Sequence, residues 1–197
     1  MIEDLILQCA VATASPAIVQ EIIQVESAAV VTAINVNGDD MVQLPASDAI
    51  EDLSSFIRVQ IAEGRTVDVG LMQVNTRHLS DFGLDVEDLF DPCVNIATGS
   101  AIFMRGYDAA KAFYGDTPLA LQSALSAYNT GTFHRGFGNG YIDRYEGDRP
   151  NAELPQRIDP GKAAAESDIE IELDFTRTHL SDSVSPDTDA KPDPGPR

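Results

Sequence analysis

The sequence predicts a mainly α fold of the α+β class, in which a helical domain carries a short β-hairpin insertion and continues into a disordered, acidic tail. Three observations lead to this prediction. Apolar residues recur at helical spacing along most of the chain, one short segment alternates around Asn37-Gly38, and seven of the eleven prolines fall from Pro150 onward. We therefore expect one domain over residues 1–149 and a Pro/acid-rich tail over residues 150–197.

The first part of the chain predicts two helices. Residues 2–11 suit a short helix, and Ser15 followed by Pro16 is typical of the start of a second, which would extend to Ser27. The apolar stripe of this second helix consists of Ile18, Val19, Ile22, Ile23 and Val25.

Glu26 follows Ile22 by four residues and Ile23 by three, so helical geometry places it on or beside this stripe. A carboxylate on an apolar face is desolvated, which raises its pKa and favours the protonated form. Most glutamates are solvated surface residues. The position of Glu26 beside the stripe nevertheless makes it a candidate proton donor.

The next segment predicts a hairpin. Residues 31–36 and 41–44 have the composition of short strands, and the turn-forming Asn37-Gly38 follows the first of them. We expect residues 67–75 to form a turn or an irregular segment.

Three longer helices are predicted from capping residues combined with apolar spacing. Each follows a residue that suits an N-cap, namely Ser47, Asp91 or Thr117, and the last two continue with proline at the first helical position. Their expected ranges are residues 48–63, closed by Gly64, residues 92–112, and residues 118–128, closed by Gly131. A glycine-rich stretch over residues 135–140 then leads to Tyr141 and a further short helix.

The charge of the chain restricts its partners. The formal net charge is -19 at pH 7 and the pI is about 4.2. Little positive charge is therefore available to displace counterions from phosphates, and we expect no nucleic acid partner. Solubility explains the acidity more simply than a specific basic partner does. No stretch approaches the roughly 20 apolar residues of a membrane span, so no transmembrane segment is predicted.

The tail contains one regular pattern. Between residues 168 and 175, Ile169, Ile171, Leu173 and Phe175 alternate with acidic residues, which is the period of a β-strand. Such a segment could add a strand to the edge of a partner's sheet. Alternatively, it is a solvated segment whose alternation is incidental.

Two further segments carry residues that suit a sugar site. In Gly70-Leu71-Met72-Gln73, the glycine permits close backbone approach to a ligand, and Gln73 offers a donor and an acceptor to an acetamido group or a hydroxyl. In Tyr128-Asn129, the ring could flank a sugar and the amide could bind one. Each segment also has a structural explanation, either a buried turn or a helix end. Ser27 likewise suits a helix-end hydrogen bond better than a nucleophile.

Taken together, these segments resemble the lytic transglycosylase family, whose members cleave peptidoglycan with a lysozyme-like fold. Glu26-Ser27, Gly70-Leu71-Met72-Gln73 and Ala127-Tyr128-Asn129 correspond to the motifs of that family in its order. The resemblance covers roughly residues 5–145. It is closest to the VirB1-type branch, the murein-degrading component of type IV secretion systems. Four longer segments point to this branch: residues 67–75, 90–95, 126–131 and 135–141.

The resemblance implies a role for each motif residue. Glu26 would be the catalytic acid and then the base. The substrate-binding residues would be Ser27, Met72, Gln73, Tyr128, Asn129 and Tyr141, the last of which would also contact the Glu26 carboxyl. This chemistry needs only one carboxylate. Asp39, Asp40 and Asp68 are the nearest candidates for the second carboxylate of a hydrolase, and all three are explained more simply as turn residues. The family requires no metal and no organic cofactor.

The reaction implied by the resemblance is a cleavage without water. Glu26 would protonate the oxygen between N-acetylmuramic acid and N-acetylglucosamine. It would then take the proton of the muramyl C6 hydroxyl, which attacks the anomeric carbon and leaves a 1,6-anhydro end.

The two cysteines are Cys9 and Cys93, which do not form a Cys-x-x-Cys zinc or redox pattern. The residues alone leave two alternatives for the cysteines, namely two buried free thiols or one disulfide. The resemblance implies the disulfide, since the branch often carries a pair at these places, and with it a periplasmic location. Met1-Ile2-Glu3-Asp4 is acidic where a signal peptide has a basic region, so no export signal is visible in this sequence.

The partners implied are peptidoglycan glycan strands and, through the tail, the channel subunits of a type IV secretion system. Two alternatives remain at this point. A lysozyme-type hydrolase would need a second carboxylate, about 6.5–9.5 Å from the acid if the enzyme inverts. A murein-bound scaffold would instead use the tail to recruit channel subunits without cleaving murein.

Overall fold

The computed structural model describes residues 2–38 and 42–145 of the chain. The elements in chain order are α1 (Ile2–Cys9), α2 (Pro16–Ser27), β1 (Ile34–Val36), α3 (Ile50–Ala62), β2 (Val67–Val69), β3 (Val74–Asn75), η1 (Thr76–His78), α4 (Leu79–Phe82), η2 (Glu87–Phe90), α5 (Pro92–Tyr114), α6 (Pro118–Thr130), α7 (Arg135–Gly138) and η3 (Ile142–Arg144). Helices dominate and the strands form one small antiparallel sheet, so the predicted fold class is confirmed. The predicted tail and its alternating segment lie outside the described residues.

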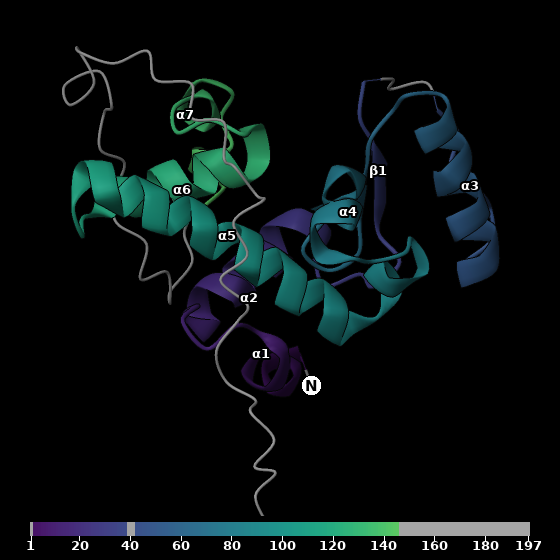
Figure 1. Ribbon diagram of the computed structural model, residues 1–197, viewed down its shortest axis with the longest axis horizontal. Helices are drawn as coiled ribbons and strands as arrows, with labels where there is room; N and C mark the ends of the chain where they lie inside the picture. Colours follow the sequence, from purple (N-terminus) through teal and green to yellow (C-terminus); the bar gives the residue numbers. More distant parts are fainter. Residues whose placement is uncertain (1, 39–41, 146–197) are drawn as a thin grey trace, which may run out of the picture.

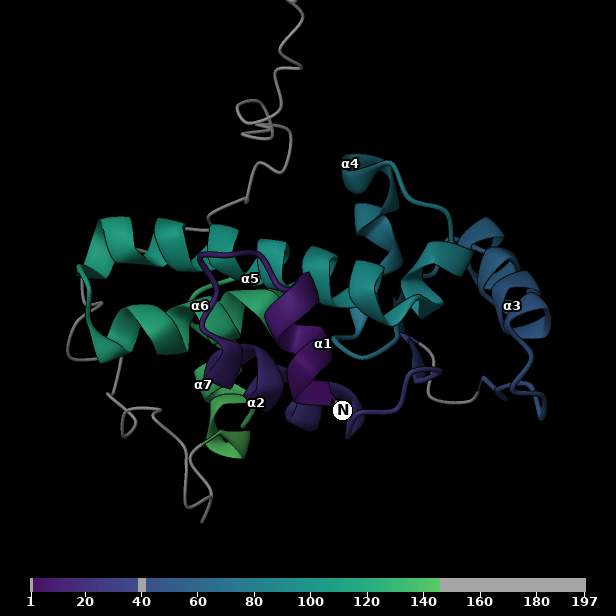
Figure 2. The ribbon, with the colours of Figure 1, turned by 90° about the horizontal axis from the view of Figure 1, so that it is seen from below.

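The longest helix, α5, runs between two lobes (Figure 1). It begins after Asp91, whose side chain accepts hydrogen bonds from the backbone N–H groups of Cys93 and Val94 at 2.8 and 3.0 Å. In both ribbon views α6 lies alongside one end of α5 and α3 lies at the other end (Figures 1 and 2), where Figure 1 also shows β1. We refer to α1, α2, α6 and α7 as the helical lobe, and to β1, β2, β3 and α3 as the sheet lobe.

Helices α2, α5 and α6 begin where predicted because local signals set their starts, whereas α3 begins at Ile50 with Ala49, not the predicted Ser47, at its N-cap position. Pro16, Pro92 and Pro118 each occupy the first turn of a helix, as expected. Gly131 ends α6 with a φ of 74°, a conformation that glycine adopts without strain. Ser15 occupies the N-cap position of α2 but makes no capping hydrogen bond through its side chain. Within the described residues, no helix combines the length and the apolar character needed to cross a bilayer.

The predicted hairpin is wrong in its second strand. β1 pairs antiparallel with β2 rather than with residues 41–44, of which 42–44 form no strand. The segment expected to be irregular, residues 67–75, contains β2 and β3. Burial explains the difference. Val67 and Val69 are both 0% exposed, so β2 is a strand of the core, and β1 pairs with it. The turn signal at Asn37-Gly38 is local and carries no information on a strand that follows α3.

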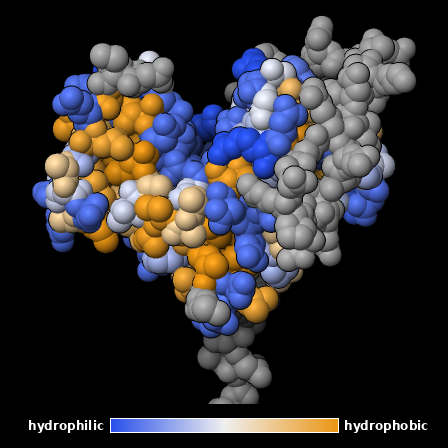
Figure 3. Space-filling view, turned by 180° about the vertical axis from the view of Figure 1, so that it is seen from behind, coloured by the Kyte–Doolittle hydropathy of each residue, from blue (hydrophilic) through white to orange (hydrophobic). Residues whose placement is uncertain are grey.

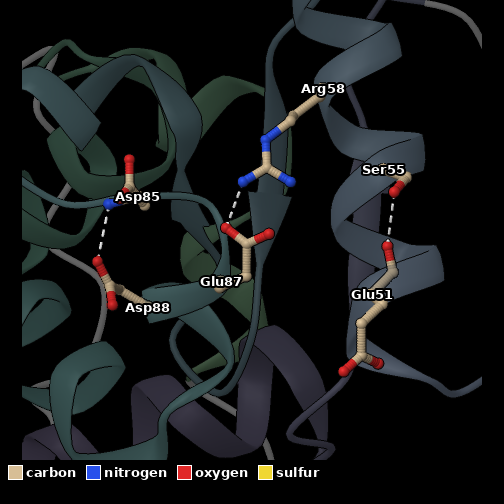
Figure 4. A network of polar contacts seen from close by, with 6 residues as sticks. All are labelled: Glu51, Ser55, Arg58, Asp85, Glu87 and Asp88. Carbon is tan, nitrogen blue, oxygen red and sulfur yellow. Dashed lines mark hydrogen bonds and ion pairs between the residues drawn. The ribbon is translucent and has the colours of Figure 1, made fainter.

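Packing positions α3 within the sheet lobe. Leu53 and Ile57 face the core and are 5% and 0% exposed. On the surface, the Arg58 guanidinium forms an ion pair with Glu87 of η2 (Figure 4). Exposed ion pairs contribute little to stability, so the apolar contacts hold this helix in place.

A disulfide between Cys9 and Cys93 joins the end of α1 to the start of α5, with a Cα–Cα distance of 5.0 Å. Nearby, the backbone N–H of Val11 donates to Ser100 Oγ at 3.1 Å. Both links tie the N-terminal segment to α5, and this segment leads directly into α2, which carries Glu26.

Candidate active site

The molecule is hollowed between the two lobes (Figure 3), and a polar cavity of about 180 Å³ takes residues from both of them. The helical lobe contributes Glu26, Tyr128, Asn129 and Thr130. The sheet lobe and the short helix after it contribute Asn37, Asp68, Gln73, Asn75, Arg77 and His78.

Glu26 lies at the end of α2, where the apolar stripe leaves its side chain half-buried at the cavity. The Tyr141 hydroxyl donates a hydrogen bond to Glu26 Oε1 over 2.5 Å. Burial raises the pKa of Glu26, and this effect outweighs the lowering by the Tyr141 hydrogen bond and the Arg144 charge. The negative charge of Asp68 also raises this pKa. The raised pKa agrees with the position of Glu26 beside the apolar stripe.

Two buried tyrosines hold the Glu26 carboxyl in place. Tyr141 and Tyr145 are 4% and 2% exposed, and their hydroxyl oxygens are 2.7 Å apart. Because a hydroxyl carries one proton and Tyr141 gives its own to Glu26, Tyr145 donates to Tyr141. Burial raises the pKa of both tyrosines, so both remain protonated donors at neutral pH. Arg144 binds the Val25 carbonyl and so ties η3 to the end of α2.

The segment Gly70-Leu71-Met72-Gln73 connects β2 to β3 in a tight turn. Gly70 has a φ of 79°, and a Cβ there would lie 2.6 Å from the Leu89 carbonyl oxygen, so only glycine fits. Gln73 lines the cavity and has a φ of 48°. Its amide nitrogen donates to the carbonyls of Ala33 and Gly70 at 3.2 and 3.0 Å. The side-chain oxygen of Gln73 is therefore the atom that can accept a hydrogen bond from a ligand.

Asn95 fixes this turn against α5. Its side chain is 1% exposed, and its Oδ1 accepts a hydrogen bond from the Met72 N–H at 2.8 Å. Its amide nitrogen donates to the carbonyls of Val69 and Leu89 at 2.9 and 2.8 Å. A buried amide that satisfies three backbone groups holds them in one arrangement.

Ser27 and Met72 lie behind the cavity rather than among its lining residues. Ser27 Oγ is 2.7 Å from the Leu71 carbonyl oxygen, to which it donates. Met72 is 0% exposed and packs over Gly99, where a Cβ would lie 2.6 Å from the Met72 Cβ. Both residues stabilise the turn from outside the cavity lining, and their contact with a substrate stays a prediction.

Tyr128 and Asn129 lie in the last turn of α6 and line the cavity. The Tyr128 hydroxyl donates to the Met72 carbonyl at 2.6 Å, and its ring makes an edge contact with Phe103. Tyr128 therefore presents its ring, not its hydroxyl, to a ligand. Asn129 Oδ1 is 3.4 Å from the Asn139 amide nitrogen. This wall offers a fixed aromatic ring beside an exposed amide.

The opposite wall carries Asp68, which lies in β2 and is not the turn residue that we expected. Its Oδ1 accepts a hydrogen bond from Asn75 Nδ2 at 2.6 Å. Its Oδ2 accepts from Asn37 Nδ2 at 2.9 Å and from Asn35 Nδ2 at 3.3 Å. Three amides thus hold one carboxylate at the cavity.

Arg77 and His78 border the sheet side of the cavity. Burial lowers the pKa of His78, and the Arg77 charge adds to this effect while Asp81 opposes it. The neutral His78 ring accepts a hydrogen bond from Arg77 Nε at 3.2 Å. In residues 2–38 and 42–145, no group of three His, Cys, Asp or Glu side chains could hold a metal ion.

The structure brings Glu26, Gln73, Tyr128 and Asn129 together around one cavity. Of three further residues of the site, Asn95 and Tyr145 did not follow from the sequence, and Asp68 was expected in a turn rather than in a strand. The four-residue spacing between Tyr141 and Tyr145 is the one local signal that could have identified a member of this group. The partners of Asp68 and Asn95 come from distant segments.

The family of the chain follows from comparison with known proteins. Residues 10–146, which are most of the chain, match the Transglycosylase SLT domain. The chain therefore belongs to this family. No solved structure matches the chain.

Several relatives are VirB1 proteins. Protein virB1 of Rhizobium radiobacter is 32% identical over 107 residues, which are 54% of this chain and 44% of that protein. The type IV secretion system protein virB1 of Brucella abortus is 34% identical over 131 residues, or 66% of this chain and 54% of that protein. The chain spans about half the length of these relatives. The uncharacterized protein y4dP of Sinorhizobium fredii is 24% identical over 192 residues, 92% of this chain and 86% of that protein.

Proposed function

We propose that the protein is a peptidoglycan lytic transglycosylase that cleaves the β-1,4 bond between N-acetylmuramic acid and N-acetylglucosamine. One observation carries the proposal: Glu26 is a half-buried carboxyl with a raised pKa, held by Tyr141 at the wall of a polar cavity. Membership of the SLT family supports it.

In the first step, the Glu26 carboxyl donates its proton to the glycosidic oxygen as the bond to the anomeric carbon breaks and positive charge develops on the muramyl ring. A carboxyl with a raised pKa is protonated nearer neutral pH and can serve as this acid. Tyr141 and Tyr145 fix the direction of the carboxyl, so that little reorganisation is needed.

In the second step, the Glu26 carboxylate accepts the proton of the muramyl C6 hydroxyl. The C6 oxygen then forms the new bond to the anomeric carbon, which gives a 1,6-anhydro end and returns Glu26 to its protonated form. The proton lost in the first step is thus recovered in the second, and no water is consumed.

The substrate would lie in the cavity between the lobes. The Tyr128 ring supports a sugar face, and Asn129 and the Gln73 oxygen bind hydroxyl or acetamido groups. Arg77 supplies positive charge on the sheet side of the cavity, which suits the anionic groups of murein. Contacts of Ser27 and Met72 with the sugar belong to the same proposal.

A lysozyme-type hydrolase is the second candidate, because one specific observation favours it. Asp68 lines the same cavity as Glu26, which gives a hydrolase its second carboxylate. In such an enzyme water replaces the C6 hydroxyl as the nucleophile and the product has a reducing end.

The setting of the reaction follows from the relatives. Because Brucella abortus virB1 is named as a type IV secretion system protein, we propose that this protein opens murein locally for such an apparatus. The periplasm is the compartment where murein and a disulfide such as Cys9–Cys93 occur together. Residues 150–197 would recruit channel subunits.

Mass spectrometry of the muropeptides released from purified peptidoglycan tests this function. We expect anhydro-muramyl products from the wild type and none from Glu26→Gln. Reducing-end products that disappear in Glu26→Gln would favour the hydrolase. Binding of murein by both proteins without any release would overturn both enzymatic functions in favour of a scaffold.

A further inference from the structure

We propose that Asp68 is a second catalytic carboxylate, which faces the sugar ring from the sheet side of the cavity and stabilises the positive charge that develops on that ring. The inference rests on the proposed function, since it requires a glycosidic bond to break in this cavity. It differs from the mechanism with a single carboxylate that the family resemblance implies.

Strand geometry directs Asp68 toward the cavity. Val67 and Val69 on either side of it are 0% exposed and point into the core. Because successive side chains of a strand point to opposite faces, Asp68 points away from the core, and it lines the cavity together with Glu26.

The register of the sheet places amides on both sides of this carboxylate. Asp68 is directly opposite Asn35 of β1 and Asn75 of β3, the two neighbours that share its face of the sheet. Both amides donate to it, and Asn37, the residue after β1, donates a third hydrogen bond. The polar face of all three strands is therefore occupied in orienting a single carboxylate.

Neutral amides orient Asp68 and leave its charge in place. An arginine or lysine partner would instead cancel that charge. The charge therefore remains directed at the cavity, and its effect reaches Glu26, whose pKa it raises. A fixed negative charge at the place where positive charge develops lowers the barrier without reorganisation. No bond to Asp68 forms, so the role is the same whether the C6 hydroxyl or water attacks the anomeric carbon.

Two variants test the role of Asp68. Asp68→Asn removes the charge, and Asp68→Ala also avoids placing an amide N–H against the three amide donors. We expect kcat/KM for release of muropeptides from glycan strands to fall by about 100-fold in both, mainly through kcat. Asp52→Asn, the same change at an exposed position of α3, should match the wild type. Thermal melting of each variant reports the folded fraction.

The pH profile separates a catalytic role from a structural one. Glu26 must be protonated to act, so kcat/KM falls as the pH rises through its pKa. Loss of the Asp68 charge lowers the pKa of Glu26, while Tyr141 and Arg144 continue to act on it unchanged. The alkaline limb of the profile should therefore move to lower pH in Asp68→Asn and Asp68→Ala.

The outcomes distinguish this inference from the proposed function. Activity of both Asp68 variants within about twofold of the wild type, with Glu26→Gln inactive, would overturn the role of Asp68 and leave the function intact. A loss that follows the folded fraction, with an unmoved alkaline limb, would also overturn it. If the wild type releases no muropeptides, the proposed function itself fails.

Discussion

The two walls of the cavity each present one carboxyl group, in opposite environments. On the helical side, Glu26 ends an apolar stripe and contacts a buried tyrosine pair, and burial raises its pKa. On the sheet side, Asp68 accepts hydrogen bonds from three amides on a polar strand face. The same functional group is thus set up as a proton donor on one wall and as a fixed negative charge on the other.

This difference shows how secondary structure divides the chemistry. A helix end brings a carboxyl against apolar side chains because its stripe must pack on the core. A strand whose alternate residues are buried leaves the others on one face, where neighbouring strands supply hydrogen-bond donors. Two carboxyls whose environments differ in this way are a basis for assigning acid and charge-stabilising roles.

Activity should depend most strongly on the helical wall. Glu26→Gln removes the carboxyl proton that the proposed reaction transfers to the glycosidic oxygen, so release of muropeptides should fall by about 1,000-fold or more. Glu51→Gln, the same change at an exposed position of α3, should retain full activity. Substantial cleavage by Glu26→Gln would show that the helical wall does not supply the proton donor.

The same variant should also change the dependence of stability on pH. Because the pKa of Glu26 is raised in the folded state, the native protein binds more protons, and its stability falls as the pH rises through that pKa. Glu26→Gln lacks this loss, so its melting temperature relative to the wild type should increase from pH 4 to pH 8. A constant difference between the two proteins would contradict the burial of Glu26.

Both walls depend on the turn that Asn95 holds. Asn95→Ala would leave the Met72 N–H and two carbonyls unsatisfied in the interior, and the free energy of unfolding should fall by about 3 kcal/mol. Urea denaturation measures this change. Gln24→Ala on the exposed face of α2 should change stability by no more than about 0.5 kcal/mol, and a similar value for Asn95→Ala would refute the proposed role of the turn.

Tyr141→Phe should act on the pKa of Glu26 in the opposite direction to Asp68→Asn. The Tyr141 hydrogen bond lowers the pKa of Glu26, so its removal raises that pKa and moves the alkaline limb of kcat/KM to higher pH. The loss of orientation should reduce kcat by about tenfold. Tyr145→Phe keeps the bond from Tyr141 to Glu26 and should move the limb less. Movement of the limb in the same direction for Tyr141→Phe and Asp68→Asn would be inconsistent with the two environments.

The smallest expected effect concerns the segment after Glu26. Ala28 and Ala29 have φ angles of 51° and 63°, a region that alanine adopts only with strain. Ala28→Gly should therefore raise the free energy of unfolding by about 0.5–1 kcal/mol. Ala112→Gly in the last turn of α5, where alanine has helical φ, should instead lower it. Destabilisation by both would mean that the segment is not strained.

The sequence predicted the helices better than the sheet, for a physical reason. Caps and prolines act within a few residues, so the starts of α2, α5 and α6 could be read directly. The partner of β1 lies beyond α3, and only burial in the folded chain selects it. The same contrast applies to the cavity: the position of Glu26 followed from helical spacing, whereas the environment of Asp68 depends on pairing between strands.

The proposed reaction requires that Glu26 enter it as a protonated acid, which its burial favours. We would measure the titration of its side-chain carboxyl carbon by NMR in the folded wild type, with Glu26→Gln to assign the signal. The predicted result is a midpoint clearly above the ordinary value of 4.5. A midpoint at or below that value would show that Tyr141 and Arg144 outweigh burial, and Glu26 could not be the acid of the proposed reaction.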